Sequence, residues 1–167
     1  EFLYNNRGVI TGVPTSFADL DQICCGFQPG DFIILAGRPS MGKTSLGLCI
    51  GYNAALKHNI PVGVFSLEMS KEQLAQRILC AEAKVDQQRL RNGTLDEDDW
   101  LKLHETAGKL SKAPIYIDDT PGISIRQLRA KARQLKAEKG LGLIIIDYLQ
   151  LLQGSRRAEN RQQEISE

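Results

Sequence analysis

The segment that most constrains the fold of this chain is Gly37–Thr44, in which two glycines five positions apart precede a lysine and a threonine. It stands between an apolar run, Phe32–Ala36, and a helical stretch that extends to about Lys57. A Gly-x-x-x-x-Gly-Lys-Thr pattern between a buried strand and a helix is typical of a phosphate-binding P-loop. Backbone N–H groups at a helix start and the helix dipole both favour a bound anion. We therefore predict a nucleotide site at this turn.

The residue types of the P-loop predict separate roles within that site. The Lys43 ammonium can reach the β- and γ-phosphates as a point charge, and the Thr44 hydroxyl can ligate Mg²⁺ between them. Gly37 and Gly42 permit a backbone approach that a Cβ atom would obstruct. The predicted cofactors are ATP and Mg²⁺, and Lys43 is predicted to assist catalysis as well as binding. The predicted nucleotide-binding residues are Gly37, Arg38, Pro39, Ser40, Met41, Gly42, Lys43, Thr44 and Ser45.

Two carboxylates are candidates for the same site. Asp147 follows the apolar run Leu143–Ile146, and ligands of α/β proteins bind beyond the carboxyl ends of the strands. We predict that Asp147 is a Walker B acid that helps to hold Mg²⁺. Glu68 follows a second apolar run, and hydrolysis needs a carboxylate to orient or deprotonate the attacking water. Because Tyr148 rather than an acid follows Asp147, Glu68 is the candidate for this carboxylate, with an ordinary solvated loop residue as the alternative.

The rest of the chain alternates short apolar runs with helical segments. Capping patterns at Ser70, Thr94 and Ser124 predict where three helices begin. Continuous apolar strands that alternate with helices indicate an α/β fold, with a parallel sheet covered by helices on both faces. The predicted strands are Phe32–Ala36, Val62–Ser66, Ile115–Ile117 and Leu143–Ile146.

The predicted helix that begins after Ser124 and ends at Gly140 is strongly basic. We interpret its charges as the solvated face of a crossover helix, with a subunit contact or a nucleic-acid contact as the alternatives. Its one acid is Glu138, and its basic residues are Arg126, Arg129, Lys131, Arg133, Lys136 and Lys139.

Composition limits the function classes. The 167 residues carry 21 Lys+Arg against 20 Asp+Glu, a formal charge of +1, so a broadly basic nucleic-acid-binding surface is excluded. Any nucleic-acid contact is therefore expected to be local. The four cysteines lack metal-binding spacing, which favours reduced thiols in a cytoplasmic protein. No apolar run is long enough to span a membrane, so no membrane association is expected.

Five segments of the sequence together resemble the motor domain of bacterial DnaB-type replicative DNA helicases. The P-loop is common to many NTPases, whereas the residues around Glu68 and after Asp147 are much more specific to this family. The segments are Gly12-Val13-Pro14-Thr15, Gly37–Thr44, Ser66-Leu67-Glu68-Met69, Ile115-Tyr116-Ile117-Asp118-Asp119 and Ile146-Asp147-Tyr148-Leu149-Gln150.

This resemblance implies a RecA-like P-loop NTPase core in a homo-hexameric ring. Such a ring hydrolyses ATP between neighbouring subunits while it moves on single-stranded DNA and unwinds the duplex at the replication fork. Primase and a helicase loader are the further partners that the resemblance implies. It also makes Lys43 the phosphate-binding lysine, Thr44 and Asp147 the Mg²⁺-binding residues, and Glu68 the catalytic glutamate.

The resemblance also implies how the sequence divides into domains and what its two end segments do. Residues 1–8 are expected to end a linker from an amino-terminal domain, and residues 9–167 to form a RecA-like ATPase domain without its later strands. One later strand is expected to lie between the P-loop strand and the Walker B strand. The sequence is therefore expected to be part of a longer protein and inactive alone. Arg156, Arg157 and Arg161 resemble the start of a DNA-facing loop and are candidate DNA contacts.

Two other functions remain open on the sequence alone. One is a RecA-class recombinase or repair ATPase, which forms filaments on DNA. The other is an assembly scaffold in which nucleotide binding sets the oligomeric state without translocation. Both share the P-loop chemistry, so the residues of the nucleotide site do not separate them from a helicase motor.

Overall fold

The computed structural model describes residues 10–38 and 40–149. The expected linker at residues 1–8 and Pro39 of the P-loop lie outside the described residues. So do the candidate DNA contacts Arg156, Arg157 and Arg161.

Three parallel strands form the sheet, in the order β2-β1-β3. The central strand β1 (Val62–Ser66) pairs on one side with β2 (Ile115–Asp118) and on the other with β3 (Leu143–Asp147). The sequence predicted these three strands but not their order, and β2 and β3 each extend one residue beyond the predicted end. The register sets Phe65 beside Asp118 and Ser66 beside Asp147. Because the strands are parallel, their carboxyl ends lie at the same end of the sheet, and this end carries Asp118 and Asp147.

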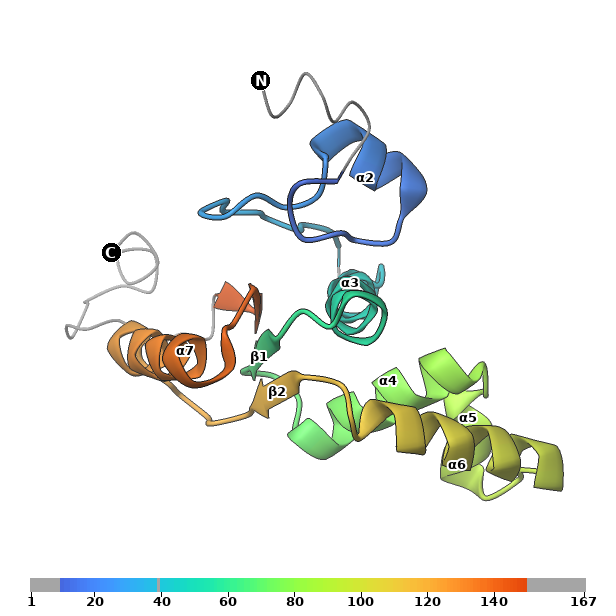
Figure 1. Cartoon of the computed structure of the whole chain (residues 1–167). Coiled ribbons are helices and arrows are strands. Elements are labelled where there is room, and N and C mark those ends of the chain that lie inside the picture. The colour runs from blue at the N-terminus through green and yellow to red at the C-terminus, as the bar shows by residue number, and fades with distance from the viewer. Residues whose placement is uncertain (1–9, 39, 150–167) are drawn as a thin grey trace.

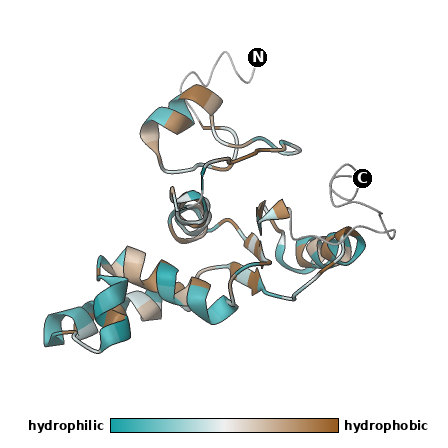
Figure 2. Ribbon diagram, turned by 180° about the vertical axis from the view of Figure 1, so that it is seen from behind, coloured by the Kyte–Doolittle hydropathy of each residue, from teal (hydrophilic) through white to brown (hydrophobic). Residues whose placement is uncertain are grey.

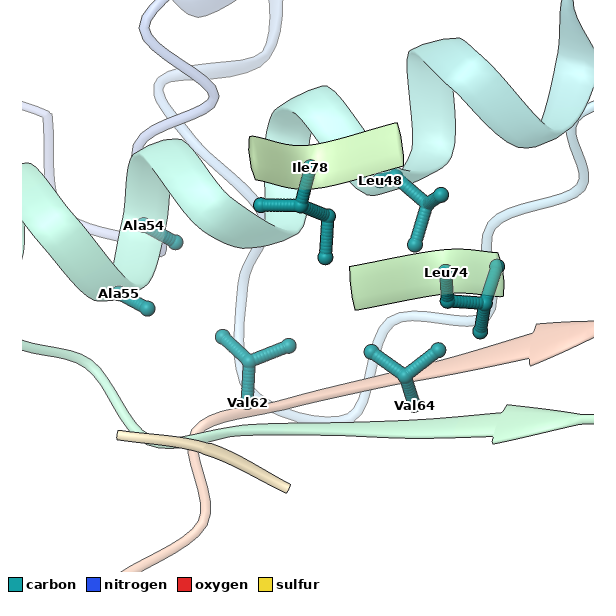
Figure 3. Packing of buried hydrophobic residues seen from close by; sticks show 7 residues of the cluster. All are labelled: Leu48, Ala54, Ala55, Val62, Val64, Leu74 and Ile78. Carbon is teal, nitrogen blue, oxygen red and sulfur yellow. The ribbon is translucent and has the colours of Figure 1, made fainter. Parts of the chain in front are cut away.

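Helices cover both faces of the sheet, which confirms the predicted α/β architecture. Helices α3 (Lys43–His58) and α4 (Lys71–Ala83) pack on one face, and α7 (Ile125–Lys139) packs on the other (Figure 1). Successive residues of a strand face opposite sides. Accordingly, Val62 and Val64 point toward α3 and α4 in a core with Leu48, Ala54, Ala55, Leu74 and Ile78 (Figure 3). Phe65 instead joins Ile123, Leu128 and Ala132 on the α7 side.

Three further helices complete the described chain: α2 (Ala18–Cys24), α5 (Gln87–Asn92) and α6 (Glu97–Leu110). Helices α4, α5 and α6 form a group beside the sheet, with a small core of its own around Cys80 and Leu103. Hydrophilic residues prevail along this group, whereas the strands are hydrophobic (Figure 2). In the described part of the chain, no helix is both long enough and apolar enough to span a membrane.

The capping patterns are confirmed at two of the three predicted helix starts. Ser70 and Ser124 each form a complete capping box with the glutamine three residues later. The prediction at Thr94 is wrong, because α6 begins after Asp96, whose carboxylate accepts a 2.8 Å hydrogen bond from the Asp99 N–H. The Thr94 N–H instead donates to the Arg89 carbonyl at 3.0 Å, so Thr94 helps to end α5.

The predicted strand at Phe32–Ala36 is not formed. This segment has no regular secondary structure, and Phe32 and Ile34 are 77% and 70% exposed. In both overall views it runs between α2 and α3, apart from the arrows of the sheet (Figures 1 and 2). A β-strand needs a hydrogen-bonding neighbour, and no described strand pairs with this run. The neighbour implied by the family resemblance is the later strand between the P-loop strand and β3.

The basic helix α7 presents most of its charge to solvent, as interpreted from the sequence. Arg126, Arg129 and Arg133 are all exposed. Two lysines are used internally: Lys131 Nζ contacts Asp118 Oδ2 at 2.5 Å, and Lys136 Nζ donates to the Leu141 carbonyl at 2.7 Å. Part of the basic character is therefore structural, and it ties α7 to the sheet.

Candidate nucleotide site

The P-loop closes as a tight turn directly before α3. The Met41 N–H donates to the Arg38 carbonyl at 3.3 Å, and Gly42 has φ 83°, a left-handed value that glycine adopts without steric cost. Gly42 is the N-cap of α3 and supplies no side-chain acceptor. The first N–H groups of a helix have no intrahelical partner, so those of α3 remain available to an anion. The turn therefore has a geometry suited to phosphate.

Thr44 and Asp147 meet at this helix start. The Thr44 Oγ1 hydroxyl donates to Asp147 Oδ2 at 2.8 Å, although the residues are 103 positions apart. The contact arises because α3 packs against β3, and Gly51 permits the close approach: a Cβ there would lie 2.6 Å from Ile145 Cδ1. The two residues predicted to hold Mg²⁺ are therefore side by side.

Lys43 lies over the ring of Tyr148, the residue that follows Asp147. Its Nζ atom is 5.6 Å from the ring centroid, within the range of a cation–π interaction. Lys43 is half-buried. In the sequence, Tyr148 is notable only because it is not an acid, and no local pattern indicates that its ring lies beneath the P-loop lysine.

Glu68 stands in the turn between β1 and α4, with an exposed side chain. The turn is joined to β3, because the Leu67 N–H donates to the Asp147 carbonyl at 2.7 Å. Glu68 therefore lies at the same end of the sheet as Asp147. It lines one pocket with residues of the P-loop, near which it was predicted to lie.

A pocket of about 860 Å³ connects these residues. Its lining includes Lys43, Thr44, Glu68 and Tyr148, together with other residues of the P-loop, of α3 and of α4. Four predicted residues, Gly37, Arg38, Met41 and Asp147, are not among the lining residues, although Asp147 touches Thr44.

Several lining residues were not predicted from the sequence, and three of them, Arg77, Gln87 and Tyr52, carry polar groups. Arg77 on α4 lines the pocket, and its Nε atom is buried without a hydrogen-bond partner among the described residues. Gln87, at the start of α5, also lines the pocket, and its Nε2 atom is likewise buried without a hydrogen-bond partner among the described residues. Burial raises the pKa of Tyr52 to about 12, and a hydrogen bond with Cys49 contributes, so its hydroxyl stays protonated. The three residues come together because α4 packs against α3 and α5 packs against α4.

The donor set fits Mg²⁺ and a nucleotide triphosphate. Mg²⁺ prefers hard oxygen ligands, and the Thr44 hydroxyl and the Asp147 carboxylate supply two that lie 2.8 Å apart. The ammonium of Lys43 and the free N–H groups of α3 are suited to phosphate oxygens. The arrangement can therefore bind a metal–phosphate group, with one exposed carboxylate, Glu68, on the wall of the same pocket.

Comparison with protein families gives a match over most of the chain. The model of the family described as the DnaB-like helicase C terminal domain matches residues 12–167. The replicative DNA helicase DnaC of Bacillus subtilis is 56% identical over 168 residues, which cover 100% of this chain and 37% of that protein. The replicative DNA helicase DnaB of Geobacillus stearothermophilus has the same identity and coverage. The chain thus spans less than two fifths of these relatives.

Solved structures give the same result. One of them, an ATPase domain, superposes with a TM-score of 0.92 at 32% sequence identity, covering 99% of this chain and 59% of that chain. A DnaB-like replicative helicase, solved in a study of its interactions with primase, superposes with a TM-score of 0.92 at 33% identity, covering 98% of this chain and 40% of that chain. These likenesses confirm the predicted RecA-like α/β fold.

Proposed function

Because this chain belongs to the DnaB-like helicase C-terminal domain family, we propose that it is the ATP-driven motor part of a replicative DNA helicase. In this proposal, residues 9–167 belong to the RecA-like ATPase domain and residues 1–8 end a linker. The motor works in the bacterial cytoplasm as a homo-hexameric ring on single-stranded DNA. Primase and a helicase loader are its proposed partners. The similarity to relatives that are named replicative DNA helicases supports this proposal.

The observation that supports the ATP chemistry is the contact between Thr44 and Asp147 beside Lys43. Thr44 and Asp147 would hold Mg²⁺, which neutralises charge on the β- and γ-phosphates. Lys43 binds the same phosphates. The proposed nucleotide-binding set is the one predicted from the sequence, Gly37–Ser45.

Glu68 is the proposed catalytic carboxylate. A water molecule that attacks the γ-phosphate must be oriented and must lose a proton, and a carboxylate within hydrogen-bond reach does both. The position of Glu68 on the pocket wall, next to a turn bonded to the Asp147 carbonyl, supports this role. ATP hydrolysis in this site supplies the free energy for movement along DNA.

Glu68→Gln tests the chemical part of the proposal in the full-length protein. The amide keeps the size of the side chain but cannot accept the proton, so ATP binding should persist while turnover falls to background. Nucleotide binding by fluorescence and phosphate release by a coupled assay measure the two effects. Loss of binding, or retention of turnover, would remove the catalytic role of Glu68.

Electron microscopy of the full-length protein with DNA tests the assembly. Closed six-membered rings support a helicase motor, and open filaments support a RecA-class recombinase. Rings that bind and hydrolyse ATP without separating a forked duplex would favour the assembly scaffold. The fork assay therefore decides between the two ring-forming alternatives.

A further inference from the structure

The turn that carries Glu68 is held by hydrogen bonds on both sides. The Ser66 hydroxyl accepts from the Met69 N–H at 3.1 Å and donates to the Met69 carbonyl at 2.6 Å, which closes the turn on itself. Ser66 is 1% exposed, so this contact is shielded from water. At its start, the turn is joined to β3 by the bond between the Leu67 N–H and the Asp147 carbonyl. The backbone before Glu68 is thus fixed.

The end of the turn is held by a residue that follows another strand. The Lys71 N–H donates to Asp119 Oδ2 at 2.9 Å, across a sequence separation of 48 positions. Lys71 is the first residue of α4, where the N–H group has no intrahelical acceptor. Ser70 and Gln73 satisfy two neighbouring donors through their capping box, so Asp119 adds a third bond at this helix start. Its negative charge also interacts favourably with the positive end of the helix dipole.

Asp119 is itself held in place by its neighbour in the chain. Asp118 Oδ2 contacts Lys131 Nζ at 2.5 Å, and Asp118 Oδ1 accepts from the Thr120 N–H at 3.0 Å. The backbone on both sides of Asp119 is therefore joined to α7 and to β2. A chain of contacts runs from α7 through the end of β2 to the first turn of α4.

We propose that Asp119 is a positioning residue for Glu68. The Glu68 side chain is exposed, so packing does not hold it, and the backbone of the turn sets where it starts and what its carboxylate can reach. By holding the Lys71 N–H, Asp119 fixes the end of the turn and with it the position of the Glu68 backbone. The inference rests on the proposed function, in which that carboxylate orients the attacking water. Misplacement of a catalytic group by about 1 Å can cost about 100-fold in rate.

Two substitutions remove the same hydrogen bond from opposite sides, in the full-length protein. Asp119→Ala removes the acceptor. Lys71→Pro removes the donor, and it leaves the helix intact because proline is favoured at the first helical position and Ser70 already has the extended backbone that precedes proline. Each should lower kcat for ATP hydrolysis by about 10- to 100-fold, while KM and nucleotide affinity change by less than about threefold.

Matched controls separate positioning from a general loss of stability. Lys71→Ala removes the same charge as Lys71→Pro but keeps the N–H, so it should retain the wild-type kcat. Asp119→Asn keeps an acceptor oxygen and should recover most of the activity. Asp96→Ala removes the N-cap of α6, outside the pocket lining, and should lower Tm without the selective loss of kcat.

The double variant Asp119→Ala/Lys71→Pro decides the outcome. Because both changes break one bond, the double variant should be no slower than the slower single variant. Wild-type kcat in both single variants, or losses that multiply, would overturn the positioning role. That result differs from a failure of the proposed function, in which Glu68→Gln would hydrolyse ATP as fast as the wild type.

Discussion

Thr44 and Asp147 are joined by a 2.8 Å hydrogen bond from the first turn of α3 to the end of β3. It brings together the two oxygen donors that the sequence analysis assigned to Mg²⁺. The bond also shows that the helix after the P-loop and the strand that ends at Asp147 pack with these two side chains in contact.

Thr44→Ala should weaken the binding of Mg²⁺-ATP by about 10- to 100-fold, because it removes a charge-assisted contact worth about 1.5–3 kcal/mol. Thr44→Ser keeps the hydroxyl and should bind almost normally. Titration with a fluorescent ATP analogue, with Mg²⁺ and then with a chelator, measures the effect. An equal loss under both conditions would mean that Thr44 does not act through the metal.

Lys43→Ala should lower the affinity for ATP by about 10- to 100-fold and the affinity for AMP much less. The reason is that the ammonium is proposed to contact the β- and γ-phosphates, which AMP lacks. Lys57→Ala, in the last turn of the same helix, is the matched control and should bind both nucleotides normally. Calorimetric titration with the two nucleotides tests this, and equal losses for both would argue against the phosphate contact.

Arg156, Arg157 and Arg161 should each contribute to single-stranded DNA binding if they contact phosphates. Replacing all three by alanine should weaken affinity and reduce the salt dependence, by about one unit of slope for each lost contact. The slope is measured by fluorescence anisotropy at several salt concentrations. The triple replacement Arg126→Ala/Arg129→Ala/Arg133→Ala on α7 is the control. A slope unchanged by the first triple and lowered by the second would move the DNA contact to α7.

Lys131→Met should reduce stability at neutral pH and reduce its loss in acid. Burial raises the pKa of Asp118, but the hydrogen bonds from Lys131 and Thr120 outweigh burial and hold that pKa below its usual value. A lowered carboxyl pKa stabilises the folded state above the unfolded-state pKa of about 3.9, and the effect disappears as pH falls through the folded-state pKa. Urea midpoints at pH 7, 5 and 3.5 should therefore converge with those of the wild type only below about pH 4. Arg129→Met, exposed on α7, should show no such convergence.

Leu74→Ala should lower the free energy of unfolding by about 2–5 kcal/mol, because Leu74 is fully buried between α4 and the sheet and the vacated space cannot fully collapse. Leu101→Ala on α6 is the control: this leucine is 58% exposed, and its replacement should change stability by less than about 0.5 kcal/mol. Urea unfolding of the full-length protein compares the two. Equal effects would contradict the packing of α4 described above.

Local patterns were sufficient for much of the fold. The Ser70 and Ser124 capping boxes predicted the starts of α4 and α7, because each cap is made within four residues of sequence. The apolar runs that form β1, β2 and β3 were also predicted, since runs of this length and composition are typical of strands in a covered sheet. Helix α5 was missed, although Asp86 as N-cap and Gly93 after its end are signals that could have found it.

The features that could not be predicted from the sequence depend on contacts between segments that are far apart in the chain. Phe32–Ala36 has the composition of a buried strand, yet a strand forms only when a neighbour is present, and composition does not report neighbours. In the site, spacing predicted Lys43, Thr44 and Asp147 individually. Tyr148 beneath Lys43 and Arg77 on the pocket wall depend on how α3, α4 and β3 pack, which no pattern within one segment encodes.

The exposed apolar segment Phe32–Leu35 and the outer edge of β3 together affect how readily the chain aggregates. No described strand pairs with the outer edge of β3, and Ile144 on that strand is 42% exposed. An open apolar edge is a template on which strands of other molecules can add. Within the described part of the chain, the outer edge of β3 and the exposed apolar run Phe32–Leu35 are therefore the two places where aggregation is expected to begin.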